Sequence, residues 1–491
     1  MSMESHAPQI DGRVRSFALI SLFLALFMEL LDATIVNVAL PSIEQSLKAS
    51  GGEQQWMVAS YTLALAIGLM TGARLGDIYG RKQLFVIGLI GFTICSVLCG
   101  LAQNPEMLIA ARALQGLSSA MMIPQVLSSI QVMYPPAERG SAMAGFSALA
   151  GVASVSGPIL GALLTEWNLF GWEWRSIFLV NVPVGIIAVT AAIRLVPESY
   201  SPTKPKLDIP GVIVLAVGLI AILYPLVMGQ EADWPTWMFV SIAFGVLVMI
   251  AFIYLQYREQ QAGGEPLVVL PLFRIRAYSA GLFIITVFFL AMNGFFLVQT
   301  LFLQLGLGFS MLRAGLTMIP FSIAVSIFAG LSAAKLVGII GRKTLQIGPL
   351  VMAIGLLGLL WVINRNGGET TSWHLLVGLF LGGAGMGLVV APIGVFVLSE
   401  VPVEYAGPAS GLFNTVQQLA AALGVAIIGT VFFSRLESLL ETGTVMPVDA
   451  YIQSYERSVW VMVAVLVLSS VTAVLLPKHP SFGHGAPEMV H

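Results

Sequence analysis

Two acidic residues, Glu29 and Asp32, lie inside one long apolar segment near the N-terminus, at residues 17–40. A spacing of three residues places both carboxylates on one face of a helix, about 4.5 Å apart along its axis. A charge near the centre of a membrane span costs about 2.5–3.5 kcal/mol on insertion scales. Repulsion between the acids and a dry environment both favour the protonated form of at least one. The pair predicts a proton-exchanging site, and a structural acid satisfied by neighbouring donors is the alternative.

The composition places most of the chain in lipid. Of 491 residues, 57% are hydrophobic and only 10% are charged, and the mean hydropathy is +0.90. A soluble domain usually holds about 25% charged residues. At about 20 residues a span, the length allows about 12 to 14 membrane helices. The net charge of −2 is too small to indicate a nucleic-acid partner.

Apolar runs bounded by charges, Pro, Gly and Asn predict fourteen membrane spans. The first has no small-residue cleavage site and is interpreted as a retained span rather than a signal peptide. The predicted spans are residues 17–40, 56–75, 84–101, 107–133, 141–164, 176–195, 209–228, 237–256, 278–303, 314–336, 345–363, 375–398, 406–433 and 459–476.

The basic residues predict the orientation. With a cytoplasmic N-terminus, 16 of the 23 Lys and Arg fall on the cytoplasmic side, six fall outside, and Arg112 lies within a span. This positive-inside bias supports an even number of spans with both termini cytoplasmic. The expected organisation is a cytoplasmic tail at 1–16, a six-helix bundle at 17–195, a linker with two extra membrane helices at 196–277, a second six-helix bundle at 278–476 and a cytoplasmic tail at 477–491.

An internal repeat supports this division. The sequence Tyr-Gly-Arg-Lys at 79–82 is echoed by Ile-Gly-Arg-Lys at 340–343, and Pro-Ala-Glu at 136–138 by Pro-Val-Glu at 402–404. The offsets of 261 and 266 residues describe two homologous halves. Paired six-helix bundles around a midplane site form one large class of secondary transporters. We therefore expect an all-α membrane protein with two pseudo-symmetric six-helix bundles and two inserted helices.

Arg112 is the only basic residue predicted inside the membrane. Asp32 lies nine residues from the outer end of its span and Arg112 eight residues from the outer end of its own, so both are about 12–14 Å deep. An unpaired arginine at that depth would be costly. We hypothesise that Arg112 pairs with ionised Asp32 and is released on protonation; a purely structural pair is the alternative.

Four sequence motifs stand out along the chain. They are Leu-Asp-Ala-Thr-Ile-Val-Asn-Val-Ala-Leu-Pro at 31–41, Arg-Ala-Leu-Gln-Gly at 112–116, Ala-Arg-Leu-Gly-Asp-Ile-Tyr-Gly-Arg-Lys at 73–82 and Gly-Pro-Ile-Leu-Gly at 157–161. Together they resemble the major facilitator superfamily and, within it, the fourteen-helix drug:proton antiporters, over nearly the whole chain. Ala73 and Ile78 depart from the usual pattern of the cytoplasmic turn, and Ala162 stands where a second glycine is usual after Gly161.

The resemblance implies a major facilitator fold and a role for each motif. The acids would serve proton coupling and recognition of cationic drugs, and the glycine-rich motif favours export. The expected proton-coupling residues are Asp32, Glu29 and Arg112. The expected gating residues are Asp77, Gly80, Arg81, Lys82, Gly157, Pro158 and Gly161. Polar residues expected to line a substrate cavity are Glu29, Asp32, Asn37, Gln115, Asn293, Gln299 and Gln417, with helix-to-helix hydrogen bonding as the alternative.

The expected function is proton-coupled efflux of lipophilic, cationic drugs by alternating access. No Gly-x-x-x-x-Gly-Lys-Ser/Thr sequence is present, so an ion gradient must supply the energy. We expect protons to be the coupling ion and no other cofactor to be needed. We also expect no metal, because Cys95 and Cys99 are interpreted as packing residues and the histidines lie in tails and loops.

The expected setting is the bacterial cytoplasmic (inner) membrane. The predicted partners are the lipid bilayer and a small lipophilic substrate, with the protein functional as a monomer. Assistance from a periplasmic adaptor protein is left open. Alternative functions are a proton-coupled exporter of one metabolite, antibiotic, siderophore or lipid; an importer or sensor on the same fold; and, more remotely, a membrane enzyme.

Overall fold

The computed structural model consists of helices throughout its described residues. These are 12–134, 149, 153, 156–157, 159–167, 171–200, 206–229, 231–402, 405–442 and 446–479. Within these ranges, thirteen helices are long and apolar enough to cross a membrane. Each overlaps one predicted span, and the remaining predicted span, 141–164, lies mostly outside the described residues. The all-α membrane fold expected from the sequence is confirmed.

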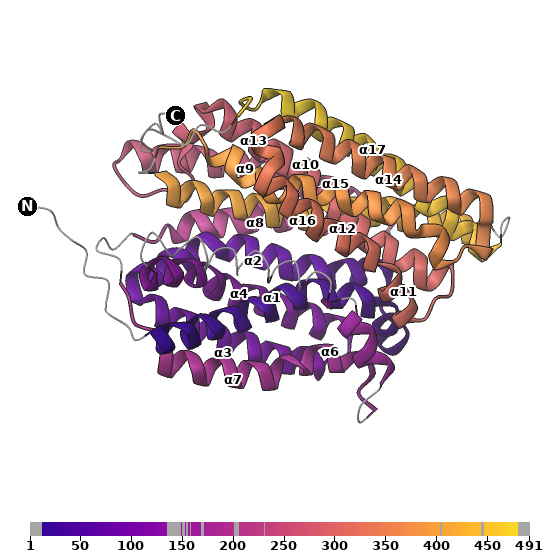
Figure 1. Cartoon of the computed structure of the whole chain (residues 1–491), viewed down its shortest axis with the longest axis horizontal. Helices are drawn as coiled ribbons and strands as arrows, with labels where there is room; N and C mark the ends of the chain where they lie inside the picture. Colours follow the sequence, from indigo (N-terminus) through magenta and orange to yellow (C-terminus); the bar gives the residue numbers. More distant parts are fainter. Residues whose placement is uncertain are drawn as a thin grey trace, which may run out of the picture. The chain divides into compact units, whose positions relative to one another are not determined.

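The chain divides into two compact units between Ala216 and Val217. The first unit includes α1 (Gly12–Leu47), the helix that contains Glu29 and Asp32, and is coloured indigo to magenta in Figure 1. Two of its helices begin at side chains that cap them: Ser50 and Glu53 form a capping box at α2 (Gly51–Tyr79), and the Asn104 side chain accepts from the backbone N–H of Met107 at α4 (Pro105–Met133). The other helices that the structure describes wholly within this unit are α3 (Arg81–Gly100), η2 (Glu173–Arg175), α6 (Ser176–Leu179) and α7 (Asn181–Leu195).

The second unit begins within α8. It therefore contains α9 and most of α8, which cover the two predicted inserted spans. The helices from this point are α8 (Ile209–Met228), α9 (Thr236–Gln261), η3 (Leu270–Arg274), α10 (Arg276–Leu301), η4 (Phe302–Gly306), α11 (Met311–Thr317), α12 (Ile319–Leu331), η5 (Ser332–Leu336), α13 (Val337–Ile340), α14 (Lys343–Asn366), η6 (Gly367–Glu369), α15 (Ser372–Leu398), α16 (Ala406–Thr442), α17 (Pro447–Thr472) and η8 (Ala473–Leu475).

The two units repeat the same helix pairings. In the first unit α4 packs on α2 and α3, and α7 packs on α1 and α3. In the second unit α15 packs on α12 and α14, and α17 packs on α10 and α14. Counted from the start of each half, these are the same four pairs of spans. The pseudo-symmetry that the sequence repeat predicted is therefore present in the packing within each unit.

The repeated Gly-Arg-Lys turns are fixed in the same way in both units. The backbone N–H of Arg81 donates to the Ser199 carbonyl at 3.0 Å, just after α7. The N–H of Arg342 donates to the Lys478 carbonyl at 2.9 Å, just after η8. The glycine before each arginine has a positive φ, 110° and 55°, which favours glycine over other residues. Each turn therefore anchors the chain that leaves the last helix of its half.

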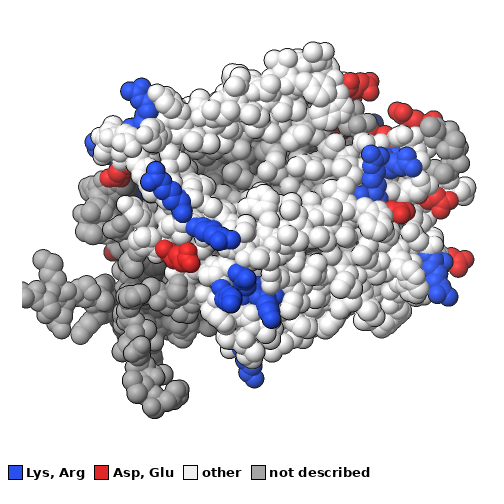
Figure 2. All heavy atoms as spheres, turned by 90° about the horizontal axis from the view of Figure 1, so that it is seen from above, with Lys and Arg blue, Asp and Glu red and all other residues white. Residues whose placement is uncertain are grey.

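Charged side chains lie mainly near helix ends, where a membrane protein meets water. Figure 2 shows Lys, Arg, Asp and Glu gathered towards the two ends of the face drawn, with uncharged surface between them. Inside the described part of the molecule, the buried charged side chains are Glu29, Asp32 and Arg112. This distribution matches a multi-pass membrane protein with one charged site in its first unit.

Glycines bring α2 and α4 into backbone contact beside this site. A Cβ added at Gly116 would lie 2.3 Å from the Tyr61 carbonyl oxygen, and one at Gly72 would lie 2.0 Å from the Ala120 carbonyl oxygen. Real Cβ atoms do not approach backbone oxygens this closely. Small residues are how membrane helices approach one another. The glycine that ends the Arg-Ala-Leu-Gln-Gly motif is thus required by packing.

The Gly116→Ala variant is expected to lose about 1–3 kcal/mol of stability, because one methyl group overfills the contact between α2 and α4. The matched control is Gly330→Ala in α12, where an added Cβ meets nothing within 4 Å. That control is expected to be neutral or slightly stabilising, since Ala favours helix over Gly. Thermal unfolding in detergent measures both, and equal unfolding temperatures for the two variants would contradict the assignment.

Candidate functional site

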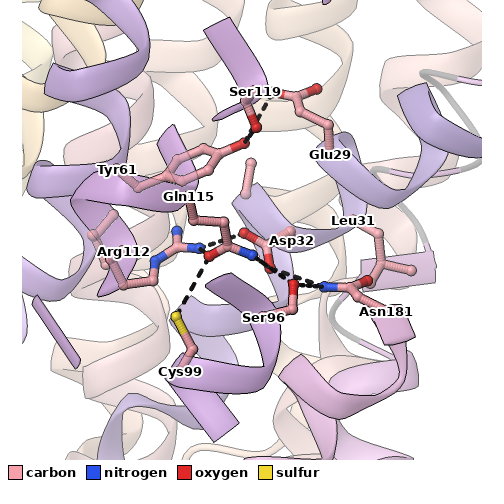
Figure 3. Close-up of polar contacts among 12 residues, drawn as sticks. Glu29, Leu31, Asp32, Tyr61, Ser96, Cys99, Arg112, Gln115, Ser119 and Asn181 are labelled. Atoms are coloured by element: carbon pink, nitrogen blue, oxygen red, sulfur yellow. Dashed lines mark hydrogen bonds and ion pairs between the residues drawn. The ribbon is translucent and has the colours of Figure 1, made fainter. Parts of the chain in front are cut away.

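The carboxylate of Asp32 is the centre of a buried polar network in the first unit (Figure 3). Its Oδ2 forms an ion pair with Nη1 of Arg112 from α4. Its Oδ1 accepts from Gln115 Nε2 at 3.1 Å and from Asn181 Nδ2 of α7 at 3.2 Å. Asp32 is fully buried and Arg112 is 1% exposed. A charge buried this deeply persists only when it is paired and hydrogen-bonded, and both conditions are met here.

Gln115 bridges the acid and the arginine. Its Oε1 accepts from Arg112 Nη1 at 2.7 Å and lies 3.7 Å from Cys99 Sγ, a weak donor. Its Nε2 donates to Asp32 and also reaches Ser96 Oγ at 3.0 Å. Every polar end of this amide is used, which fixes the side chain between α1, α3 and α4. Gln115 thus sets the geometry of the pair as well as contacting it.

Arg112 is also fixed from α2 and α6. Its Nε donates to the Met57 carbonyl at 3.2 Å. The guanidinium carbon lies 4.2 Å from the centre of the Tyr61 ring and 5.9 Å from that of Phe178. Aromatic faces attract a guanidinium, more strongly when water is excluded. Arg112 is therefore bound by a carboxylate, an amide, a carbonyl and an aromatic face.

Glu29 lies one turn from Asp32 on α1 and has a different partner. It is 6% exposed, and the Tyr61 hydroxyl donates to its Oε1 at 3.4 Å. The same hydroxyl shares a hydrogen bond of 3.0 Å with Ser119 Oγ of α4. Among the described residues, Glu29 thus has one neutral donor, whereas Asp32 has a guanidinium and two amides. The two acids occupy different electrostatic settings although they share a helix face.

Several members of this network were missed from the sequence. Ser96, Asn181, Tyr61 and Ser119 were given no role, and Cys99 was interpreted only as a packing residue. Each is a polar or weakly polar residue within an apolar segment. That pattern is the one feature of the sequence that could have marked them as members of a buried polar network. Asn181 lies within the predicted span 176–195.

The cytoplasmic turn contains a local ion pair. Arg81 Nη2, at the start of α3, lies 2.9 Å from Asp77 Oδ1, near the end of α2, with both side chains partly exposed. The backbone N–H of Lys82 donates to Glu198 Oε1 at 3.2 Å. An added Cβ at Gly80 would lie 2.7 Å from that same carboxylate oxygen. An ion pair exposed to water, such as that between Arg81 and Asp77, contributes little to stability. A bridging or gating role for these residues stays a prediction.

The glycine-rich motif of the fifth predicted span contacts α1 next to the acids. A Cβ added at Gly157 would lie 1.9 Å from Thr34 Oγ1, and one at Gly161 would lie 2.7 Å from the Ile35 side chain. Pro158 lies outside the described residues. The two glycines therefore allow close packing on α1, and their part in gating stays a prediction.

The remaining predicted cavity residues are Asn37 on α1 and, in the second unit, Asn293, Gln299 and Gln417. The amides of Asn37 and Asn293 donate to the carbonyl four residues earlier in their own helices, at 3.5 and 2.9 Å. Gln299 is buried on α10, where its Oε1 accepts from the Tyr455 hydroxyl of α17 at 2.6 Å. Gln417 is half-buried on α16. The structure thus brings Asp32, Arg112 and Gln115 together, and substrate contact by the others stays a prediction.

A buried acid–arginine pair inside a twice-repeated bundle of membrane helices defines a secondary transporter fold. The chain belongs to the major facilitator superfamily, whose family model matches residues 22–425. It is 44% identical to a Streptomyces coelicolor protein named "Probable actinorhodin transporter", over 84% of this chain and 71% of that protein.

Two further comparisons agree with this membership. The chain is 35% identical to the "Multidrug resistance protein Stp" of Mycobacterium tuberculosis, over 88% of this chain and 78% of the relative. A solved bacterial homologue of the human lysosomal transporter Spinster, inward-facing and unoccupied, superposes with a TM-score of 0.65 at 18% identity. That alignment covers 95% of this chain and 97% of the other, and it shows the fold alone.

Proposed function

We propose that this major facilitator is a proton-coupled antiporter that exports lipophilic, cationic compounds by alternating access. The observation that carries the proposal is the buried network of Asp32, Arg112 and Gln115 beside Glu29. Membership of a transporter family whose relatives are named for antibiotic and multidrug transport or resistance supports the export of such compounds. The lipid bilayer and one small lipophilic molecule are the partners that this function requires.

The proposed coupling uses charge alone. An ionised Asp32 is bound to Arg112, and a proton on Asp32 removes the charge that binds the guanidinium. Among the described residues, the Tyr61 hydroxyl is the hydrogen-bond partner of Glu29 and no cation is paired with it, so in this proposal its negative charge is the one available to attract a cationic substrate. A proton and a cationic substrate therefore compete for the same negative charge. Protons are the coupling ion, and no further cofactor or nucleic acid takes part in this scheme.

The proposed setting is the bacterial cytoplasmic membrane, with both termini on the cytoplasmic side and the protein active as a monomer. The excess of Lys and Arg on that side supports the orientation. Export in this orientation takes substrate from the cytoplasm or inner leaflet and uses the inward proton gradient. A periplasmic adaptor is an additional partner in this proposal only where a second membrane lies beyond.

A dedicated exporter of one antibiotic is the second candidate. It is supported by the 44% identity to a relative named for transport of the single compound actinorhodin. The relative named for multidrug resistance is 35% identical and supports the broader substrate range. The two candidates share the same proton chemistry and differ in the range of substrates.

Proteoliposomes containing a pH-sensitive dye test the proposal. Without an imposed proton gradient, binding of a cationic dye such as rhodamine 6G is expected to release protons from the protein. With an imposed proton gradient, the protein is expected to transport the dye against the dye's own concentration gradient. Competition among unrelated cationic dyes would support a multidrug exporter. Proton release in response to a single polyaromatic antibiotic alone would support a dedicated exporter. Substrate accumulation in the same direction as the protons would show an importer instead.

The Glu29→Gln variant is expected to raise the KM for cationic substrates about tenfold, equivalent to 1.4 kcal/mol, because the amide has no negative charge. Proton-driven efflux of a neutral substrate is expected to continue, since Asp32 and Arg112 are unchanged. Initial efflux rates over a range of substrate concentrations measure both effects. The matched control is Glu106→Gln, an exposed acid in the first turn of α4. An equal rise of KM for neutral and cationic substrates would contradict a charge-reading role.

A further inference from the structure

Tyr61 reaches Glu29 with its hydroxyl and, with its ring, the Arg112 guanidinium that pairs with Asp32 (Figure 3). Its side chain comes from α2 and is 1% exposed. The hydroxyl reaches Glu29 Oε1 at 3.4 Å, while the ring face lies 4.2 Å from the Arg112 guanidinium carbon. Arg112 in turn forms the ion pair with Asp32. One rigid side chain therefore joins the surroundings of Glu29 to those of Asp32.

The hydroxyl end has one proton and two acceptors within reach. Tyr61 donates to Glu29, and the 3.0 Å contact with Ser119 can run in either direction. When Tyr61 donates to the carboxylate, Ser119 must donate to Tyr61, because a phenol has a single O–H. A proton on Glu29 removes the need for that donor and frees the phenol to donate to Ser119. The direction of the hydrogen bonds thus follows the charge of Glu29.

The ring end responds to the same change. Donation to an anion increases the electron density of the phenol, and an electron-rich ring attracts a cation more strongly. An ionised Glu29 therefore strengthens the contact between Tyr61 and Arg112, and a proton on Glu29 weakens it.

The ring position is also restricted by the backbone. The Tyr61 carbonyl lies where an added Cβ on Gly116 would be only 2.3 Å away, so α2 and α4 are in contact at this residue. The backbone that carries the ring therefore cannot move away from Arg112 without a change in the packing of these helices.

We propose that Tyr61 is a positioning residue that links the two acids: its hydroxyl favours the ionised form of Glu29, and its ring holds Arg112 beside Asp32. This inference rests on the proposed proton coupling and specifies its order. Glu29, with one neutral donor, takes the first proton; the weaker hold on Arg112 then prepares Asp32 for the second.

The other groups around this link are few in the described ranges. The ionisable or charged ones are Asp32 on α1, Cys99 on α3 and Arg112 on α4. The contacts from α6 and α7 come from Phe178 and Asn181, which are uncharged. An effect of a Tyr61 variant on the pH titration can therefore be attributed to Glu29 and to these neighbouring groups.

Infrared spectroscopy of the protonated carboxyl groups tests the link without any substrate. The full-length protein in proteoliposomes is titrated with acid, and the Glu29 and Asp32 bands are identified from Glu29→Gln and Asp32→Asn. The Tyr61→Phe variant keeps the ring and removes the hydroxyl. It is expected to move the midpoint of the Glu29 band to higher pH by about one unit, a tenfold change in proton binding. The Asp32 band is expected to move in the same direction by less, because the ring still faces Arg112 but no longer gains electron density from the hydrogen bond to Glu29.

Two further variants separate the roles of ring and hydroxyl. Tyr61→Leu removes the ring and is expected to move the Asp32 band further to higher pH than Tyr61→Phe does, because Arg112 is held less firmly. Ser119→Ala removes the neighbouring hydroxyl but leaves the bond to Glu29, so it serves as the matched control with a smaller shift. Size-exclusion profiles and thermal unfolding check folding, and the isosteric Tyr61→Phe variant decides the hydroxyl part by itself if Tyr61→Leu does not fold.

Binding of rhodamine 6G across the same pH range provides a second measurement. Tyr61→Phe is expected to move the pH midpoint of dye binding by the same amount in the wild-type background and not at all in Glu29→Gln. An unmoved Glu29 band, a shift that persists in Glu29→Gln, or equal effects of Phe and Leu on the Asp32 band would overturn the inference. Failure of the proposed function would show separately, as absence of dye-induced proton release by the wild-type protein.

Discussion

The Asp32→Asn variant is expected to reduce proton-driven efflux to the level of vesicles without protein. Asparagine has nearly the same shape as aspartate and can still accept a hydrogen bond from Gln115 or Asn181. It cannot carry a proton, and it leaves the buried guanidinium of Arg112 without its counter-charge. Efflux against a concentration gradient, driven by an imposed pH difference, is the measurement. Full proton-driven efflux by this variant would show that the coupling site lies elsewhere.

Stability has to be separated from coupling in this experiment. Removing one partner of a buried ion pair typically costs about 3–5 kcal/mol. The double variant Asp32→Asn with Arg112→Gln removes both charges, so it is expected to regain much of that stability. It is not expected to regain proton-driven efflux, because no titrating group remains at this position. Recovery of unfolding temperature without recovery of transport assigns the defect to the lost proton carrier rather than to folding.

The Arg112→Ala variant is expected to uncouple transport from protons while substrate still equilibrates down its gradient. Without the guanidinium, Asp32 loses the one charged donor that the described residues give it, so no ion pair remains for a proton to break. Uptake of a proton at Asp32 is then no longer linked to the movement of substrate. The unpaired carboxyl, the empty volume and the lost Met57 contact are also expected to lower stability by about 3–5 kcal/mol.

Two controls sharpen the arginine experiment. Arg112→Lys keeps the positive charge but loses the planar fork that reaches Asp32 and Gln115 together, so partial coupling is expected. Arg74→Ala removes an arginine near the end of α2 that donates to the Lys206 carbonyl at 2.9 Å, away from the buried network. Substrate-induced proton release, measured beside downhill dye flux, distinguishes loss of coupling from loss of transport. Coupling that survives in Arg112→Ala would leave the pair with a structural role only.

Much of the fold could be predicted because lipid imposes simple rules on the sequence. Apolar runs identified the helices, and the repeated turns indicated two equivalent halves. Helix ends were less accurate, because an apolar run stops at the first charge whereas helical hydrogen bonds continue beyond it. The last helix shows this clearly: the predicted span began at residue 459, and α17 begins at Pro447 and includes Asp449, Glu456 and Arg457.

The site could be predicted only in part. Equal depth in two spans was enough to place Asp32 beside Arg112, since a buried arginine needs a counter-charge. Asn181 lies 149 residues after Asp32 in the sequence. No local sequence pattern indicates which faces of two such distant helices pack together. The amide of Asn37 donates to a carbonyl of its own helix, which was the alternative weighed for such residues, and its place in a substrate cavity stays a prediction.

The buried charges of the first unit also determine how the membrane potential acts on transport. Arg112 carries a fixed positive charge, while a proton can cancel the charge of Glu29 or Asp32. The site therefore runs from one net negative charge, with both acids ionised, to one net positive charge, with both protonated. Each elementary charge moved across the membrane is worth about 2.3 kcal/mol per 100 mV. Exchange of one proton for one monovalent cation draws nothing from the potential, whereas exchange of two protons draws on it directly. An exporter built on this site would thus be driven by voltage only when both acids are protonated in each cycle.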